Sequence, residues 1–398
     1  MSCSNITSVG TPTTSLSPAW HRRPLSKRLT FRVVTCCAAL IFTVALIEAT
    51  LRVLTPAPAF SASLNLHMNL DTVLEPDLHG VATPVRFTTN RWGMRGSTPP
   101  VGPAWDEATT IVAIGGSTTQ CFFLDDSRTW PAVLEKELRS TGHNVWVGNA
   151  GQAGHSTIGH VAMVDGPIAQ IRPDYVLFLV GVNDLSVSLR PQWRWDESMS
   201  ESLLGQARSA GLNWLLDHSR LAYRLHLAKQ VHFDGSTVRS KDFSIALPTE
   251  PATGDEYRPA LGDDGILTSL PLFRRNVVSL IEVVRSFGAT PVFLTQPLLI
   301  EDSPQWANVR ARSSWMKKQK VHLTGDGYAR LLDRFNDVLL DICAQRNVPC
   351  LDLAGIVPHS TDYYYDLVHY NDAGAKLVGE AVGAYFRAHV LPAPKATS

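Results

Sequence analysis

The sequence lacks a charge excess of either sign, because 36 Lys and Arg residues balance 36 Asp and Glu residues over 398 positions. Proteins that bind nucleic acid usually carry a clear excess of basic residues. We therefore expect no nucleic acid partner. No internal repeat is visible, and the hydrophobic fraction of 44% is that of an ordinary globular protein with a sizeable core.

Cysteine is scarce. The six cysteines are too few for a disulfide scaffold, and none shows the paired spacing of a zinc site: Cys3, Cys36, Cys37, Cys121, Cys343 and Cys350. We expect neither a metal nor an organic cofactor. Cys343 and Cys350 could join a helix end to the next strand by a disulfide if the domain is exported, and two separate buried thiols are the alternative.

Acidic residues are absent from positions 1–32, which carry five basic ones: Arg22, Arg23, Lys27, Arg28 and Arg32. An uncharged run follows from Val33 to Ile47, and it extends to position 54 if Glu48 and Arg52 are tolerated. These two are one helical turn apart and could pair. A basic flank before an apolar run predicts a cytoplasmic tail (1–32) and a transmembrane signal-anchor (33–54), with the rest of the chain exported.

Two other interpretations of this segment remain open. Ala57-Pro58-Ala59 resembles a signal-peptidase site, so the segment could be a cleaved signal peptide. Its content of Ser and Arg also suits an organellar transit peptide. A buried core helix is a poor explanation, because nothing upstream could form a core around it.

The remainder divides into a connector and an α/β domain. Residues 55–106 are rich in Pro, Thr and Asn and predict a connector with at most short strands. Over 107–392, five apolar runs lack the alternation of a half-exposed strand: Thr109–Ile114, Asn144–Val147, Tyr175–Val180, Pro291–Leu294 and Pro349–Leu353. Such runs predict strands of a parallel sheet that is buried on both faces. The span of about 186–270 interrupts the succession of strands and helices and predicts a helical insertion.

Helical stripes lie between the predicted strands. Apolar residues recur at helical spacing over 130–138, 331–342 and 377–386, and Asn371 or Asp372 could cap the last helix. The alternation of strand and helix predicts a doubly wound three-layer α/β/α sandwich.

Four polar clusters stand at strand ends or in a late loop: Gly115-Gly116-Ser117-Thr118-Thr119, Asn149 to Ser156, Gly181-Val182-Asn183-Asp184, and Asp366-Leu367-Val368-His369. A serine nucleophile needs a base and a group that orients the base. Ser117, His369 and Asp366 supply these types. The oxyanion of an acyl-transfer intermediate needs N–H donors, and the backbone amides of Ser117 and Gly154 with the side-chain amide of Asn183 would provide three. A side chain at position 154 could block close approach.

These clusters, in this order, resemble the blocks of the SGNH (GDSL-like) hydrolase family. The resemblance maps onto Ser117, Gly154, Asn183 and His369, with Asp366 completing a catalytic triad. It implies a flavodoxin-like sandwich and hydrolysis of carboxylic esters without a cofactor. The predicted membrane tether and exported active site favour a glycan or lipid of the cell envelope as the substrate. The resemblance covers residues 86–390, and Asn90 to Gly96 looks like a lead-in of membrane-anchored members. Gly116 departs from the Asp that many members carry, which puts substrate choice in doubt.

Other functions fit parts of the pattern. Gly-Gly-Ser-Thr after a strand could cradle a phosphate, but no Lys follows as a P-loop requires. An O-acyltransferase acting on cell-surface polysaccharide would have the same active site. A non-catalytic, membrane-tethered glycan-binding protein could keep the same scaffold.

Several residues near these clusters allow both a functional and a structural role. Cys121 could be a thiol nucleophile, although free cysteine is usually a small buried hydrophobic residue. His155 could touch substrate or be an ordinary loop histidine. Trp193, Trp195 and Trp214 could stack on sugars or pack the insertion. The basic, aromatic stretch from Trp306 to Lys320 could bind acidic glycans or anionic headgroups, or be a solvated loop.

Overall fold

The computed structural model describes residues 27–54, 70–189, 215, 219–222, 225, 269–311 and 322–392. The chain divides into two compact units, Met1–Thr55 and Pro56–Ser398. The predicted cleavage site at Ala57-Pro58-Ala59 and the tryptophans Trp193, Trp195 and Trp214 lie outside the described residues.

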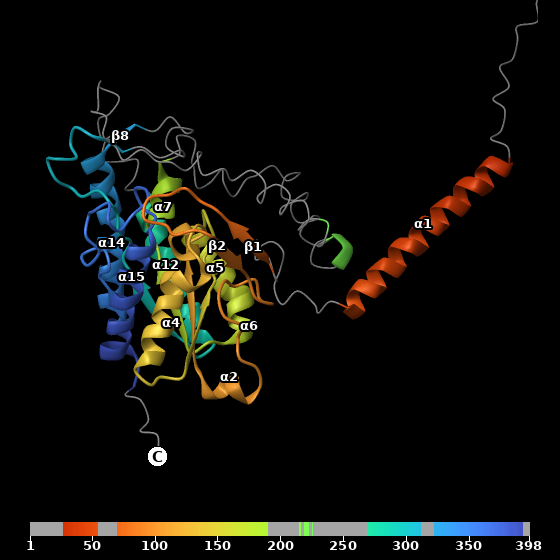
Figure 1. Ribbon diagram of the computed structural model, residues 1–398, viewed down its shortest axis with the longest axis horizontal. Helices are drawn as coiled ribbons and strands as arrows, with labels where there is room; N and C mark the ends of the chain where they lie inside the picture. The colour runs from red at the N-terminus through yellow and green to blue at the C-terminus, as the bar shows by residue number, and fades with distance from the viewer. Residues whose placement is uncertain are drawn as a thin grey trace, which may run out of the picture. The chain divides into compact units, whose positions relative to one another are not determined.

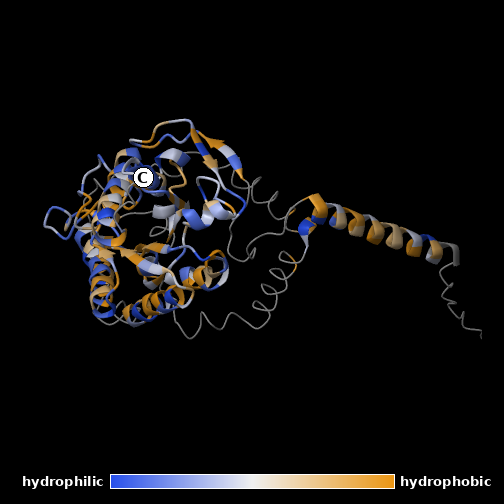
Figure 2. Ribbon diagram, turned by 90° about the horizontal axis from the view of Figure 1, so that it is seen from below, coloured by the Kyte–Doolittle hydropathy of each residue, from blue (hydrophilic) through white to orange (hydrophobic). Residues whose placement is uncertain are grey.

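The first unit contains one long helix, α1 (Lys27–Leu54). Within it, Thr30–Leu54 is long and apolar enough to cross a membrane, and none of its most apolar window is buried. Figure 2 shows α1 coloured as hydrophobic over most of its length. Its 25 residues span about 38 Å at a rise of about 1.5 Å per residue, more than the hydrocarbon core of a bilayer needs. Glu48 Oε1 and Arg52 Nε lie 2.8 Å apart, which confirms that these two residues pair.

The second unit is built on a parallel sheet. Its strands are β3 (Thr109–Gly115), β4 (Val145–Asn149), β5 (Tyr175–Leu179), β6 (Thr290–Leu294) and β9 (Cys350–Leu351). They lie in the order β4-β3-β5-β6-β9, and every pair is parallel. This is the flavodoxin-like order. Each strand begins within one residue of its predicted start, but β9 is shorter than the predicted run of 349–353.

Helices cover both faces of this sheet, as Figure 1 shows. Val112 and Ile114 of β3 pack with α5 (Thr157–Met163), α12 (Leu270–Ser286) and α14 (Gly325–Arg346). Ile111 and Ala113 point to the other face, against α4 (Trp130–Ser140) and α15 (Asp372–Tyr385). Because both faces are covered by apolar side chains, the strand sequences show no polar alternation. The three-layer α/β/α fold is therefore confirmed.

The outer edge of β4 is closed by side chains of α4. Glu135 Oε2 accepts the Val147 amide at 3.1 Å, and Arg139 Nε donates to the Val145 carbonyl at 2.9 Å. An open strand edge can pair with another chain, so these contacts protect the sheet.

Residues 70–106, which the sequence analysis placed in a connector, contain two short strands and a helix. β1 (Asp71–Leu74) pairs antiparallel with β2 (Val85–Thr88), and α2 (Pro103–Glu107) follows. Val85, Phe87 and Met94 are buried. This part of the connector thus packs as part of the second unit.

Short elements complete the description. They are α3 (Ser117–Gln120), η2 (Asp126–Arg128), η3 (Val164–Ile168), α6 (Ala169–Ile171), α7 (Val182–Ser188), β7 (Arg310–Ala311), β8 (Leu323–Thr324) and η6 (Phe386–Val390). The proposed insertion at about 186–270 begins inside α7 and ends where α12 starts, and most of it lies outside the described residues.

Candidate active site

Ser117 lies just after the carboxyl end of β3. Ligands of such sheets bind at the rim that the carboxyl ends of the strands form. The strand ends at Gly115, Gly116 makes the turn, and Ser117 is the first residue of the four-residue helix α3. A Cβ atom on Gly116 would lie 2.1 Å from Asn183 Nδ2. The glycine therefore allows the Asn183 amide to lie directly beside the serine turn.

The bend that precedes α15 brings the predicted base to this serine. His369 Nε2 lies 2.7 Å from Ser117 Oγ, although 252 positions separate the two residues in sequence. His369 Nδ1 lies 2.6 Å from Asp366 Oδ2. The structure thus places Ser117, His369 and Asp366 in one continuous chain of hydrogen bonds.

Asp366 is held by its own loop. Its Oδ1 atom accepts the backbone amides of Val368 at 2.8 Å and His369 at 2.7 Å, and the side chain is almost completely buried. Burial is the largest single effect on its pKa and opposes ionisation. The charge of His369, the His369 ring and the two amides together outweigh burial and lower the pKa. We therefore expect a carboxylate at neutral pH.

The His369 ring is fixed by two neighbours. Burial has the largest individual effect and disfavours the imidazolium, but the charge and hydrogen bond of Asp366 outweigh it and raise the pKa of His369 above its ordinary value. The ring of Tyr365 stacks on the imidazole, with centroids 5.5 Å apart and planes inclined by 4°. Its orientation toward Ser117 is thus set by packing as well as by hydrogen bonding.

Gly154 lies in an exposed loop and has a φ of +79°. A Cβ atom there would meet no protein atom within 4 Å. The glycine suits this position because of its left-handed backbone conformation, and crowding by the protein itself is not the reason.

Asn183 and Asp184 tie this loop to the sheet. Asn183 Nδ2 donates to the His155 carbonyl at 2.9 Å. Asp184 Oδ1 accepts the Thr157 amide at 3.1 Å and the Thr157 hydroxyl at 2.5 Å, at the first residue of α5. Burial, only partly opposed by these hydrogen bonds, raises the pKa of Asp184 to about 6. The third polar cluster therefore holds the second in place.

The part of the sequence that carries this site matches a known protein family. Residues 113–377 match the model of the GDSL-like lipase/acylhydrolase family. The chain belongs to this family. All five residues predicted for the site lie within the matched range.

Individual relatives are more distant. Esterase TesA of Pseudomonas aeruginosa is 29% identical over 109 residues, which are 27% of this chain and 53% of the relative. The chain thus spans about half the length of that curated protein. Among solved structures, TesA is 16% identical, with 71% of this chain and 99% of that chain covered and a TM-score of 0.40. Axe2, an acetylxylan esterase from Geobacillus stearothermophilus, is 13% identical, with 73% and 97% covered and a TM-score of 0.39.

The other candidate residues of this GDSL-like protein lie in surroundings that suit a structural role. Cys121 is buried, and burial raises the pKa of its thiol to about 11, so it is protonated at neutral pH. Burial lowers the pKa of His155, whose carbonyl is the acceptor for Asn183. Trp306 packs against Gly325 at the start of α14. Residues 312–320, with the remaining basic and aromatic side chains of that stretch, lie outside the described residues.

Cys343 and Cys350 are free thiols in the structure. A hydrogen bond between the two thiols and burial raise the pKa of Cys350. The two cysteines therefore lie close together, as the disulfide interpretation requires, but they are not bonded.

One supporting residue was missed by the sequence analysis. Gln296 follows β6 at the same rim and is buried, and its Oε1 accepts the Thr118 hydroxyl at 3.2 Å. Asn336 of α14 holds the Gln296 backbone through two hydrogen bonds of 2.9 and 3.1 Å. The position of Gln296 just after a predicted strand is the sequence signal that could have identified it.

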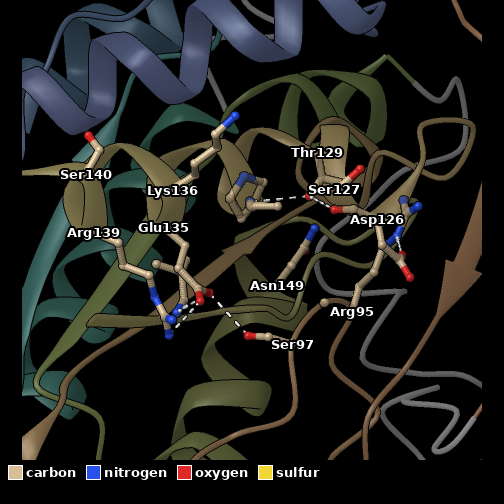
Figure 3. Close-up of a pocket in the computed structure, with 14 residues that line it drawn as sticks. Arg95, Ser97, Asp126, Ser127, Thr129, Glu135, Lys136, Arg139, Ser140 and Asn149 are labelled. Carbon is tan, nitrogen blue, oxygen red and sulfur yellow. Dashed lines mark hydrogen bonds and ion pairs between the residues drawn. The ribbon is translucent and has the colours of Figure 1, made fainter. Parts of the chain in front are cut away.

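A large hollow in the described part of the domain is not lined by the proposed triad. It measures about 750 Å³ and lies between α4, the edge strand β4 and the loop of Arg95, Gly96 and Ser97 (Figure 3). Size alone therefore does not locate the candidate active site, and the hydrogen-bonding geometry does.

Proposed function

We propose that this chain is a membrane-anchored serine hydrolase of carboxylic esters, with Ser117, His369 and Asp366 as its catalytic triad. The observation that carries the proposal is the pair of contacts at 2.7 and 2.6 Å that joins the serine hydroxyl to the imidazole and the imidazole to a buried carboxylate. Membership of the lipase/acylhydrolase family and the similarity to an esterase support the same reaction.

The first half of the reaction forms an acyl-enzyme. Ser117 Oγ attacks the ester carbonyl while His369 Nε2 takes the hydroxyl proton, and Asp366 stabilises the resulting imidazolium. The tetrahedral intermediate then collapses, and the imidazolium gives its proton to the departing alcohol. The second half repeats these steps with water in place of the serine hydroxyl and releases the acid.

The developing oxyanion would be bound by the amides of Ser117 and Gly154 and by the Asn183 side chain. The Asn183 amide has two hydrogens, and the His155 carbonyl accepts one of them. The second remains for the substrate. This contact also fixes the direction of the amide before the substrate arrives.

The serine is tested by substitution. Ser117→Ala should lower kcat on a short acyl ester by a factor on the order of 10⁴ to 10⁶, because the nucleophile is lost. Labelling by a fluorophosphonate probe should disappear, and the melting temperature should be unchanged. Ser140→Ala, at an exposed serine of α4 that bonds only its own helix, is the matched control.

Two results would contradict the proposal in different ways. Labelling that persists in Ser117→Ala places the nucleophile elsewhere. A folded wild-type protein that neither hydrolyses esters nor reacts with the probe would instead favour a non-catalytic, glycan-binding scaffold.

The acceptor of the acyl group is a separate part of the proposal. We infer that water is the acceptor and that the ester belongs to a glycan or lipid of the cell envelope, since α1 would hold an exported domain at the membrane. Incubation with an acyl donor and candidate polysaccharides distinguishes hydrolysis from transfer to a polysaccharide. Free acid as the main product supports hydrolysis, and acylated polysaccharide identifies an acyltransferase.

A further inference from the structure

The helix that begins with Ser117 is too short to be stable by itself. α3 has four residues, whereas isolated helices shorter than about 12 residues are marginal in water. The carbonyl groups at the end of a helix have no partner within it. The position of Ser117 therefore depends on the groups outside α3 that donate hydrogen bonds to these carbonyls.

Those carbonyls are bound by three side chains from other segments. Trp130 Nε1 of α4 donates to the Thr118 carbonyl at 3.1 Å. Asn149 Nδ2, at the end of β4, donates to the Thr119 carbonyl at 2.8 Å. Arg95 Nη1 donates to the Gln120 carbonyl at 2.9 Å and also to the Cys121 carbonyl. Arg95 Nη2 donates to the Leu124 carbonyl. One guanidinium thus binds the carbonyl of the last residue of the serine helix and two carbonyls of the turn that follows it.

Arg95 is itself fixed. Its side chain is 2% exposed, its Nε lies 2.7 Å from Asp126 Oδ1, and its guanidinium carbon lies 4.5 Å from the centre of the Phe87 ring. A buried cation costs several kcal/mol unless it is paired and hydrogen-bonded, and here every contact is to an acceptor or a ring face. Figure 3 shows Arg95, Asp126 and Asn149 together beside the large hollow.

The backbone of Arg95 extends this connection to the second polar cluster. The Arg95 amide donates to the Asn149 carbonyl at 2.8 Å, and the Asn149 amide donates to the Arg95 carbonyl at 3.2 Å. Asn149 Oδ1 accepts the Gly151 amide at 2.9 Å, at the start of the loop that carries Gly154. Arg95 is therefore linked both to the serine helix and to the loop that carries Gly154, one of the proposed oxyanion donors.

We infer that Arg95 is a positioning residue for the reaction, and that the segment before the family domain is part of its catalytic apparatus. The inference rests on the proposed function and extends it to a residue outside the family match, which begins at residue 113. Arg95 would act through the α3 turn and the Asn149 loop, and it would not touch the substrate. A misplacement of about 1 Å at a reacting group can cost about 10²-fold in rate.

Arg95→Lys is the decisive variant. Lysine keeps the charge opposite Asp126 but lacks the planar fork that reaches several carbonyls at once. We expect kcat on a short acyl ester to fall about 10- to 100-fold with KM little changed, and fluorophosphonate labelling of Ser117 to slow by the same factor. Arg95→Met should show a loss at least as large where it folds.

Arg86→Lys is the matched control, because Arg86 lies on the same segment with a side chain that is 63% exposed and paired with Asp71. Its kcat and labelling rate should equal those of the wild type. Activity is expressed per folded molecule, with melting temperatures measured for each variant.

The outcomes separate the two claims. A wild-type protein that neither hydrolyses esters nor reacts with the probe contradicts the proposed function and, with it, this inference. An active wild type whose Arg95→Lys variant has a lower melting temperature but the same kcat and labelling rate overturns the inference alone, since Arg95 would then be merely structural. If Arg95→Met does not fold, Arg95→Lys decides.

Discussion

At the scale of single residues, His369 must be neutral at Nε2 before it can take the proton of Ser117. Burial alone would favour the neutral ring, but the charge and hydrogen bond of Asp366 outweigh it and raise the pKa of His369. Activity belongs to the deprotonated form, so kcat/KM should rise with pH through a pKa above about 6.5. A pH–rate profile on a neutral ester measures it.

Asp366→Asn provides the comparison for this prediction. The variant removes the charge that stabilises the imidazolium, so the rising limb should move to lower pH, and kcat should fall by about 10⁴-fold because the tautomer is no longer fixed. A flat wild-type profile from about pH 5 to about pH 9 would argue against a histidine base.

The residues of the proposed triad could be predicted from the sequence because each stands in a short polar block. The block of Ser117 ends an apolar run, and the block of Asp366 and His369 precedes the last helical stripe. Arg95 could not be predicted in this way. Its burial depends on Asp126, 31 positions later, and on carbonyl groups, which leave no trace in the residue types. Gly116 is intermediate: its departure from the family pattern was visible, but only the structure shows that any side chain there would collide with Asn183.

At the scale of elements, the start of α7 fixes the start of α5 through Asp184 and Thr157. The folded state raises the pKa of Asp184 from 3.8 to about 6, with burial as the main cause. The folded protein therefore binds this proton more tightly than the unfolded chain does. Stability from this group is fully present below about pH 4 and is lost as pH rises toward about 6.

Asp184→Asn should remove this loss of stability with rising pH. Between about pH 4 and about pH 6, the difference in unfolding free energy between wild type and variant should change by on the order of 1–3 kcal/mol and then stay constant. Urea unfolding over a pH series measures it. Asp165→Asn, which removes a carboxylate at an exposed position after α5, is the matched control. Parallel curves for wild type and Asp184→Asn would show that the group is not perturbed by folding.

Most of the long, periodic elements could be predicted, although the 17-residue helix α12 was not named, and the shortest helices could not. The five strands and helices α4, α14 and α15 follow patterns that span several residues. α3, with four residues, is shorter than any window in which helical periodicity can be recognised. β1 and β2 have four residues each beside prolines, so their sequence resembles that of a connector.

At the scale of the whole molecule, parallel strands explain how distant segments form one site. All five strands run in the same direction, so their carboxyl ends, and the polar residues that follow them, meet at one rim. The serine follows the first strand of this sheet and the histidine follows the last, and the strand order brings both to the same edge. A sequence pattern can predict this meeting without a single contact being known.

The proposed anchor is a property of α1, whose apolar run is not buried in the described part of the chain. We expect the full chain to remain with membranes after extraction at alkaline pH, and a chain without residues 1–54 to be soluble with the same kcat on a soluble ester.

Leu40 and Val44 both lie on exposed positions in the middle of α1, one turn apart. Arginine at the centre of a membrane span costs about 2.5–3.5 kcal/mol per residue, so Leu40→Arg with Val44→Arg should abolish membrane retention. The matched Leu40→Ala and Val44→Ala pair should retain it. A mature protein whose N-terminus begins just after Ala59 would show instead that the segment is a cleaved signal peptide. In that case the full activity should be found in the soluble fraction.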